Sequence, residues 1–377
     1  MKILHAASSP RPPSGIKHQM ESEQAAASEL GINWDVRLFC PEGSTPPSPI
    51  TKFTGTPKSI SNVTFVNKLS AWSAWRREYY EWLHEQEAYY DTILLRYHMY
   101  DPYQLQFLRK VKRPVYLVHH TLEVPELAKA RGRGGLVRAL LELMLGRRTI
   151  RAAHGVIGVT QEIVDYELKR AKGARLRSTV YPNGITTSES PLDARCGAPT
   201  EILFVASSFS SWQGLDLLLK SVRQSGENFI LHIVGTTSDV DREKANKDPR
   251  VRFHGRLSQD EIAKLSARCS LGLSSLALHR KNMKQACTLK AREYLKLGLP
   301  VYAGYQDVFC ENFPYFRCGP CDVDAILAYA NEHTTTSRAE VVSAAHPKID
   351  KKVLLMNLYE WLNGVSENTI KSRARGD

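Results

Sequence analysis

The chain has 377 residues, of which 42% are hydrophobic and 24% are charged, so it is long enough for two domains that each have a hydrophobic core. The formal net charge of +12 is compatible with nucleic acid, an anionic membrane surface or a phosphorylated substrate as a partner. The sequence contains no apolar run of about 18 residues, so no transmembrane helix is expected. The first apolar run is too short for a signal peptide, which predicts a cytoplasmic protein.

The seven cysteines are an odd number and are mostly scattered through apolar segments, which fits a reducing compartment. Cys318 and Cys321 form a C-x-x-C without a second pair or a histidine cluster. A loop with two unpaired thiols and a metal or redox motif both remain open for this pair.

In the first half of the chain, short β-rich runs alternate with helical patterns. Strands are expected at KILHAAS, WDVRLFC, VTFVN, TILLRY, PVYLVHH, GVIGVT and STVYPN. Helices are expected over residues 19–30, 70–88, 136–152 and 162–172. These elements predict a first Rossmann-like domain over residues 1–190.

Residues 190–200 are polar, small and proline-containing, which is typical of a linker. The alternation then restarts with strands at EILFVAS, NFILHIVG, RVRFHG, SLGLSS and PVYAG and helices over 214–224, 258–268 and 288–297. Such alternation indicates parallel sheets covered by helices on both faces. We therefore predict an α/β protein with two Rossmann-like parallel-sheet domains facing across a cleft. The second domain spans 198–350, and a final helical segment of about 351–377 packs back on the first.

Open parallel sheets bind ligands beyond the carboxyl ends of their strands. In the second domain, Ser207 and Ser208 end a strand, and Gly214 opens an amphipathic helix. Farther on, Thr288 is a candidate N-cap for a helix that carries Lys290 and Glu293. Helix starts offer unpaired backbone N–H groups to an anion, although a solvated surface helix also fits this second stretch.

In the first domain, Gly15 follows the first strand and would let the backbone approach a ligand closely. The stretch lacks G-x-G-x-x-G, so an ordinary strand–helix loop fits equally well. His119 and His120 end another strand and are expected on opposite sides of the sheet, with a core or loop role as the alternative. Arg96, Tyr97 and His98 end a third strand and could line a cleft. The dipeptide Asn183-Gly184 predicts a tight turn with positive φ.

Together these stretches resemble the retaining family 4 glycosyltransferases of the GT-B fold. The resemblance is carried, in order along the chain, by SGIKHQ, YPNGI, SSWQGLDLLLKSV with ILHIVG after it, and above all EYLKLGLPV. In that family the last stretch contains the later Glu of a Glu-x7-Glu motif and a G-x-P-V turn. Glu293, Gly298 and Pro300 occupy the matching positions.

The resemblance implies a hexosyltransferase that uses a UDP- or GDP-linked sugar, retains the anomeric configuration and needs neither cofactor nor metal ion. Glu293 would accept hydrogen bonds from both ribose hydroxyls, and helix N–H groups with Lys290 would hold the leaving diphosphate. The acceptor would be a growing, lipid-linked surface polysaccharide or oligosaccharide, as in lipopolysaccharide or capsule synthesis. The implied donor-binding residues are Ser207, Ser208, Gln213, Gly214, Lys284, Thr288, Leu289, Lys290 and Glu293. The implied catalytic residues are His120, which would bond a donor-sugar hydroxyl, Glu293 and Gln285, and the implied acceptor-binding residues are Gly15, Ile16, Lys17, Arg96 and Tyr97.

This sequence departs from the family pattern at three places. Gln285 stands where the first Glu of the motif is usual, Gln213 where a phosphate-binding Lys is usual, and Ser207 and Ser208 where its companion Arg is usual. We hypothesise that Lys290, with Arg292 or Arg280, supplies the missing positive charge. A degenerate, non-catalytic relative remains an alternative.

Residues 131–151 hold six Arg and one Glu among large apolar residues. A basic amphipathic helix can lie on an anionic bilayer, which would attach the protein to the inner face of the cytoplasmic membrane, with help from the basic tail KSRARGD. Alternatively, the helix packs on the first domain with its arginines in water.

Two functions of other classes also remain open: a nucleotide-sugar epimerase of the GT-B fold, and a basic nucleic-acid-binding module. The second fits the charge, but the sequence has no helix-turn-helix, RNP-like run or aromatic-rich basic groove, so no nucleic-acid partner is expected.

Overall fold

The computed structural model describes residues 1–54, 65–129, 134–187, 199–245, 248–309 and 312–364. This described part of the chain divides into two compact units. Unit 1 contains the chain up to Tyr181 and the stretch from Lys351, and unit 2 contains Pro182–Asp350. Within the described ranges, no helix combines the length and the apolar character needed to cross a membrane.

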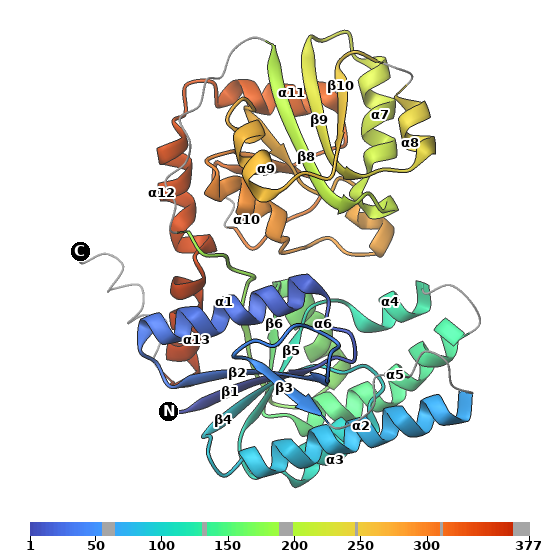
Figure 1. The fold of residues 1–377 in the computed structure, drawn as a ribbon, viewed down its shortest axis with the longest axis vertical. Helices are drawn as coiled ribbons and strands as arrows, with labels where there is room; N and C mark the ends of the chain where they lie inside the picture. Colours follow the sequence, from blue (N-terminus) through green and yellow to red (C-terminus); the bar gives the residue numbers. More distant parts are fainter. Residues whose placement is uncertain (55–64, 130–133, 188–198, 246–247, 310–311, 365–377) are drawn as a thin grey trace. The chain divides into compact units, whose positions relative to one another are not determined.

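Unit 1 is built on a seven-stranded parallel sheet in the order β3-β2-β1-β4-β5-β6-β7 (Figure 1). Its strands are β1 (Ile3–Ser8), β2 (Trp34–Pro41), β3 (Thr51–Thr54), β4 (Thr92–Arg96), β5 (Val115–His119), β6 (Gly155–Gly158) and β7 (Arg177–Val180). Its helices are α1 (Ser14–Leu30), α2 (Phe65–Gln86), α3 (Pro102–Lys110), α4 (Glu123–Lys129), α5 (Gly134–Ala152), α6 (Gln161–Ala171) and α13 (Lys351–Leu362).

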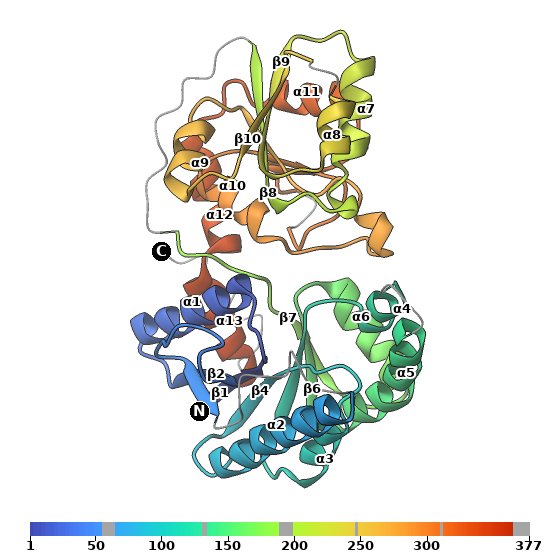
Figure 2. The ribbon, with the colours of Figure 1, turned by 45° about the vertical axis from the view of Figure 1, so that its right-hand side comes forward.

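Successive residues of the unit 1 strands enter two different cores, because side chains alternate across a sheet. On β4, Ile93 and Leu95 pack in the core that contains α2 and α3. Leu94, between them, packs in the core that contains α1 and α13. Helices therefore cover both faces of this sheet (Figure 2).

Unit 2 is built on a six-stranded parallel sheet in the order β10-β9-β8-β11-β12-β13. Its strands are β8 (Thr200–Ser208), β9 (Phe229–Thr236), β10 (Val251–Gly255), β11 (Leu271–Leu273), β12 (Val301–Ala303) and β13 (Phe316–Cys318). Its helices are η1 (Ser211–Gln213), α7 (Leu215–Gln224), α8 (Asp239–Lys244), α9 (Gln259–Ser266), η2 (Leu278–Lys281), α10 (Leu289–Lys296), α11 (Val323–Glu332) and α12 (Arg338–Ile349).

The sheet of unit 2 is also covered on both faces. Ile202 and Phe204 of β8 pack with α7 and α11. Leu203, between them, packs with α10 and α12. Two doubly wound parallel sheets confirm the predicted fold class.

The predicted strand at VTFVN is wrong from Phe65 onward, because α2 already begins there. The β-branched run suggested a strand, but α2 buries Trp75, Tyr79 and Leu83 along one helical face. The sequence also predicted no helix at α3, although a start signal is present. Asp101 is its N-cap and accepts from Tyr103 N at 2.9 Å, and a proline occupies the first turn.

The predicted linker lies mostly at residues 188–198, outside the described residues, as does the basic tail beyond residue 364. The final helix α13 packs with α1, and its Leu354, Leu355 and Leu358 join the same core as Met20 of α1.

Candidate functional site

The loop after β8 brings the backbone of unit 2 close to the segment after β11. Ser207 and Ser208 are exposed at the carboxyl end of β8. Gly214 then adopts a left-handed φ of +78°, and a Cβ there would lie 3.0 Å from Leu276 Cβ. Leu276 N donates to Gln213 O at 2.9 Å. Because a side chain at position 214 would be strained and crowded, glycine is required for this approach.

Lys290 lies beside Gln213, although α10 and η1 are far apart in sequence. Its Nζ donates to Gln213 Oε1 at 2.6 Å, and Ser275 Oγ donates to the same oxygen at 3.0 Å. The ammonium also lies 5.5 Å from the centre of the Phe204 ring. Loss of hydration lowers the pKa of Lys290 to about 7. A desolvated cation thus stands next to the glutamine that occupies the family's phosphate-binding lysine position.

Thr288 is the N-cap residue of α10, but its side chain makes no capping hydrogen bond to the helix. Its Oγ1 lies 2.7 Å from Tyr305 Oη and 3.1 Å from Ser274 Oγ instead. The threonine hydroxyl therefore leaves the first-turn N–H groups, near Leu289 and Lys290, to other acceptors.

Glu293 is exposed, whereas Arg292 and Tyr294 on either side of it are buried. It follows Lys290 by three residues, so both lie on one side of α10. Glu293 is therefore in contact with solvent. Immediately before α10, Lys284 is exposed and Gln285 is half-buried in a bridge with Gln306.

Arg292 cannot supply charge to a ligand, which corrects part of the hypothesis above. Its side chain is fully buried, and its two terminal nitrogens donate to the Asp307 carboxylate at 2.6 and 2.5 Å. Arg280 is also engaged, because it forms a two-point ion pair with Asp216 at 2.8 Å. Among Lys290, Arg292 and Arg280, only Lys290 has no carboxylate partner in the contacts described. It is bonded to a neutral amide instead.

The YPNGI stretch does not form the predicted turn. Neither Asn183 nor Gly184 is among the residues with positive φ. Asn183 is held by long-range bonds: its Nδ2 donates to Cys287 O at 2.7 Å, and Arg292 Nε donates to its carbonyl at 3.1 Å. Long-range bonds to the α10 region replace the local turn.

In unit 1, Arg96 and His120 meet at the carboxyl ends of the adjacent strands β4 and β5. Arg96 Nη1 lies 2.9 Å from His120 Nε2. The guanidinium can only donate, so His120 Nε2 accepts and its hydrogen is on Nδ1. Burial, with Arg96 nearby, holds the pKa of His120 well below its usual value, so the ring is neutral. Burial likewise lowers the pKa of Arg96 to about 10.

Tyr97 and His119 belong to a buried polar network. Tyr97 donates to Glu142 Oε1 at 2.6 Å and stacks on His119 at 4.3 Å between ring centres. His119 Nδ1 lies 2.8 Å from Glu123, and Arg170 pairs with Glu123, Glu142 and Glu167. Tyr97 is only 9% exposed, so its expected place in the lining of an acceptor site does not fit. The core alternative holds for His119.

The first turn of α1 contains Gly15, Ile16 and Lys17. Gly15 is exposed and a Cβ there would meet nothing within 4 Å, so an ordinary residue would also fit. Lys17 Nζ donates to Pro46 O at 2.7 Å. The N-cap, Pro13, makes no side-chain capping bond, so this helix start too has N–H groups without a side-chain cap.

Two of three comparisons with known proteins give matches. Residues 199–316 match the family model described as "Glycosyl transferases group 1". A search of curated proteins finds no match.

Solved structures match the chain over both units. The lipopolysaccharide outer core galactosyltransferase WaaB has a TM-score of 0.66 at 12% identity, covering 97% of this chain and 99% of the other. Sucrose-phosphate synthase from Thermosynechococcus elongatus has a TM-score of 0.67 at 16% identity, covering 97% and 100%. Anabaena HepE, solved in complex with UDP, has a TM-score of 0.62 at 18% identity, also covering 97% and 100%.

The family match over residues 199–316 of unit 2 includes Gln213, Lys290 and Glu293, and the structural likeness extends over both sheets. Residues 199–316 of the second unit are similar to a glycosyl transferases group 1 domain, and the structural matches show that the two units together have the GT-B fold.

Proposed function

We propose that the protein transfers a hexose from a nucleoside-diphosphate sugar, and that unit 2 binds the nucleotide. The observation that carries this proposal is the group of three features on α10: a helix start without a side-chain cap, the desolvated Lys290 beside Gln213, and the exposed Glu293 three residues later. The UDP complex of the structural neighbour HepE supports a uridine nucleotide as the first donor to test.

Each feature suits one part of the donor. A carboxylate can accept hydrogen bonds from two neighbouring hydroxyls, so Glu293 would hold the ribose. The diphosphate gains negative charge as the sugar–phosphate bond breaks, and N–H groups at the start of α10 with Lys290 would stabilise that charge. The exposed Ser207, Ser208 and Lys284, with Gly214, would complete the donor contacts. No divalent cation is needed in this scheme, because Lys290 and the helix start supply the positive potential.

We propose that His120 contacts the donor sugar. A neutral imidazole whose Nε2 is engaged by Arg96 presents its Nδ1–H as a donor, which suits a sugar hydroxyl better than it suits nucleophilic attack. Gln285 would add an amide contact to the sugar where the family has a carboxylate. Transfer with retention of configuration rests on the family resemblance.

The acceptor side of the proposal is a lipid-linked glycan used at an anionic membrane. Helix α5 supports it, because several of its small residues are buried and several of its large apolar residues are exposed. Gly135, Ala139 and Gly146 are buried, whereas Leu136, Leu140 and Met144 are 64%, 61% and 63% exposed. The exposed Arg147, Arg148 and Arg151 follow on the same helix. Gly15, Ile16, Lys17 and Arg96 remain the proposed acceptor contacts.

The donor proposal is tested by Glu293→Gln. An amide can accept from one ribose hydroxyl but cannot provide two equivalent charged acceptors, so UDP affinity should fall by about 10- to 100-fold. Binding is measured by titration calorimetry and by thermal shift, with GDP and ADP as competing nucleotides. Glu227→Gln, at another exposed glutamate of unit 2, is the control and should bind as the parent does. Equal affinity of Glu293→Gln and the parent would show that the nucleotide binds elsewhere.

A further inference from the structure

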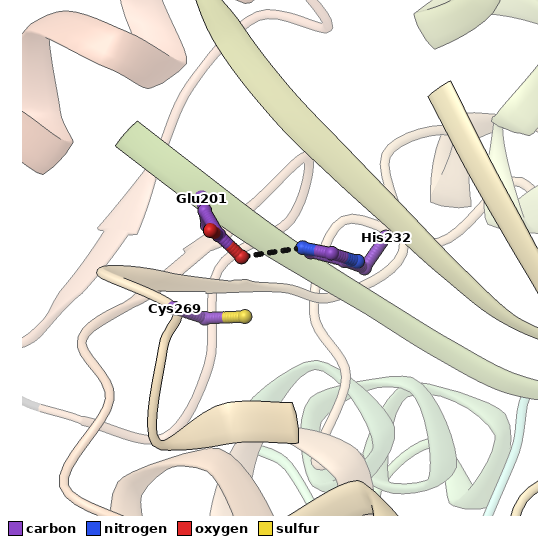
Figure 3. Close-up of side chains that lie close together, drawn as sticks. All are labelled: Glu201, His232 and Cys269. Carbon is purple, nitrogen blue, oxygen red and sulfur yellow. Dashed lines mark hydrogen bonds and ion pairs between the residues drawn. The ribbon is translucent and has the colours of Figure 1, made fainter. Parts of the chain in front are cut away.

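Unit 2 also contains a cluster of side chains that could bind a metal ion. It lies at the end of the sheet opposite to the proposed donor contacts. Glu201, at the start of β8, His232, on β9, and Cys269, just before β11, place one carboxylate oxygen, one imidazole nitrogen and one sulfur within 4.8 Å of one another (Figure 3). Glu201 precedes Ser207 by six residues, so a strand rise of about 3.3 Å per residue puts the cluster roughly 20 Å from the carboxyl end of β8. The cluster is therefore separate from the proposed donor contacts.

We propose that Glu201, His232 and Cys269 bind a Zn²⁺ ion. A thiolate, an imidazole and a carboxylate are the ligands that zinc takes in proteins, and a site with a thiolate selects zinc over magnesium or calcium. In a tetrahedral zinc site, ligand atoms are roughly 3.3–3.8 Å apart, so the 4.8 Å limit needs only a small closure. The thiolate and the carboxylate also neutralise the dication.

The register of the sheet explains why the three side chains converge. His232 is paired with Leu203, two residues after Glu201, so Glu201 and His232 project from the same face of neighbouring strands. Cys269 enters the core on that face, and its sulfur points toward the pair in Figure 3. Arg338 holds the backbone of this cysteine in place, because its Nη2 donates to Cys269 O at 2.9 Å.

The outer contacts orient the first two ligands. Arg268 Nη2 donates to Glu201 Oε1 at 2.8 Å, which leaves Oε2 facing His232 Nε2 at 2.7 Å. His254 Nε2 lies 2.9 Å from His232 Nδ1. Such contacts to the far side of a ligand are usual around protein-bound zinc.

Metal binding requires a defined movement of protons. Without metal, the hydrogen on His232 Nε2 bonds to Glu201. With metal, His232 Nε2 gives its lone pair to zinc, and the single ring hydrogen of His232 is carried on Nδ1 and donated to His254 Nε2. The exposed His254 changes tautomer at the same time: it gives up its Nε2 hydrogen to water and takes one from water on Nδ1, so both rings stay neutral. The Cys269 thiol also loses its proton to water, together with its weak bond to Leu265 O at 3.4 Å. The fourth position is left for a water molecule.

The first experiment uses the full chain, stripped with a chelator and titrated with Co²⁺ and Zn²⁺. We expect about one metal ion per chain, a near-ultraviolet sulfur-to-cobalt charge-transfer band, and a melting temperature that rises with Zn²⁺. Absence of the band, or of any Zn²⁺-dependent shift, overturns the proposal. Catalytic activity is not the readout, so this test is independent of the donor-site test.

Variants then assign the ligands. Cys269→Ser and His232→Gln should each lose the band and bind metal at least about tenfold more weakly. Cys318→Ser and His279→Gln, at exposed residues outside the cluster, are the matched controls and should bind as the parent does. Retention of the band in Cys269→Ser, or its loss in Cys318→Ser, contradicts the assignment.

If the two buried variants fail to fold, the exposed outer residues decide the matter. Arg268→Gln and His254→Gln should fold and should weaken metal binding by about 10- to 100-fold, because both orient ligands without touching the metal. Unchanged metal affinity in both would overturn the proposal.

Discussion

At the scale of single residues, the charge state of Lys290 connects folding to ligand binding. Its ammonium is desolvated, bonded to a neutral amide, and has a pKa of about 7. A lysine in the unfolded chain has a pKa of about 10.4. Between these two values the unfolded state holds a proton that the folded state lacks, so the free energy of unfolding should rise as pH rises from 7 to about 10.

We expect nucleotide binding to reverse this shift. A diphosphate beside Lys290 favours the charged form, so binding above pH 7 should take up about one proton. Affinity for UDP should accordingly fall by up to about tenfold per pH unit above pH 7. Calorimetry in buffers of different ionisation enthalpy measures the uptake directly.

The variant Lys290→Met should remove both effects and weaken binding at pH 6.5, where the parent lysine is charged. The control is Lys220→Met, at an exposed position of α7. If proton uptake persists in Lys290→Met, another group is responsible and Lys290 does not contact the phosphates.

At the scale of helices, α5 presents the reverse of an ordinary packed amphipathic helix. Its buried side contains Gly135, Ala139 and Gly146, which let it lie close to its neighbours, and its exposed side contains leucines and a methionine. Exposed apolar area with adjacent arginines suits an anionic bilayer, which can accept the apolar side chains and pair with the guanidinium groups.

The double variant Leu140→Ser/Met144→Ser tests this surface. It should lose most of its co-sedimentation with vesicles that contain anionic phospholipid, while binding of UDP stays unchanged. Val240→Ser, which alters another exposed apolar side chain in unit 2, should sediment as the parent does. Equal sedimentation of all three proteins, or equal binding to purely zwitterionic vesicles, would count against an electrostatic membrane contact through α5.

The turn between η1 and α7 supplies a second test at this scale. Gly214→Ala adds a Cβ at a left-handed φ and 3.0 Å from Leu276 Cβ, so it should destabilise unit 2 by about 1–3 kcal/mol. Gly226→Ala is the matched control, because a Cβ at Gly226 meets nothing within 4 Å and it should change the stability little. Thermal unfolding of both variants measures the difference, and a similar effect at the two positions would remove the argument that glycine is required at 214.

At the scale of the whole molecule, the first unit is completed by the last described helix. α13 contributes Leu354, Leu355 and Leu358 to the core of α1 and the unit 1 sheet, although unit 2 lies between them in sequence. The fold of unit 1 therefore needs the segment from Lys351 onward, which follows unit 2 in the sequence.

Leu355→Ala should destabilise unit 1 by about 2–5 kcal/mol, since Leu355 is fully buried and the substitution leaves a cavity. Asn357→Ala, at an exposed position of the same helix, should have little effect. Differential scanning calorimetry can follow the two units as separate transitions, and a destabilisation confined to unit 2 would contradict the described packing.

The sequence alone determined the doubly wound parallel architecture, because short apolar runs and amphipathic helical patterns are local signals that survive without knowledge of the fold. The sequence also predicted Glu293 and Lys290 as donor-binding residues, because both lie on one short helix that follows a strand. It failed at VTFVN, where local β propensity was overridden by a helix that packs aromatic residues on the sheet.

Only the tertiary structure decided which side chains are accessible to a ligand. Gln213 and Lys290 are 77 residues apart and meet through loops at one end of the sheet. Arg292 and Tyr97 looked like ligand contacts but are buried against Asp307 and Glu142, because burial and pairing depend on distant partners that periodicity cannot reveal. The Glu201–His232–Cys269 cluster likewise exists only in the folded chain, since strand register, not spacing along the sequence, brings its three atoms together.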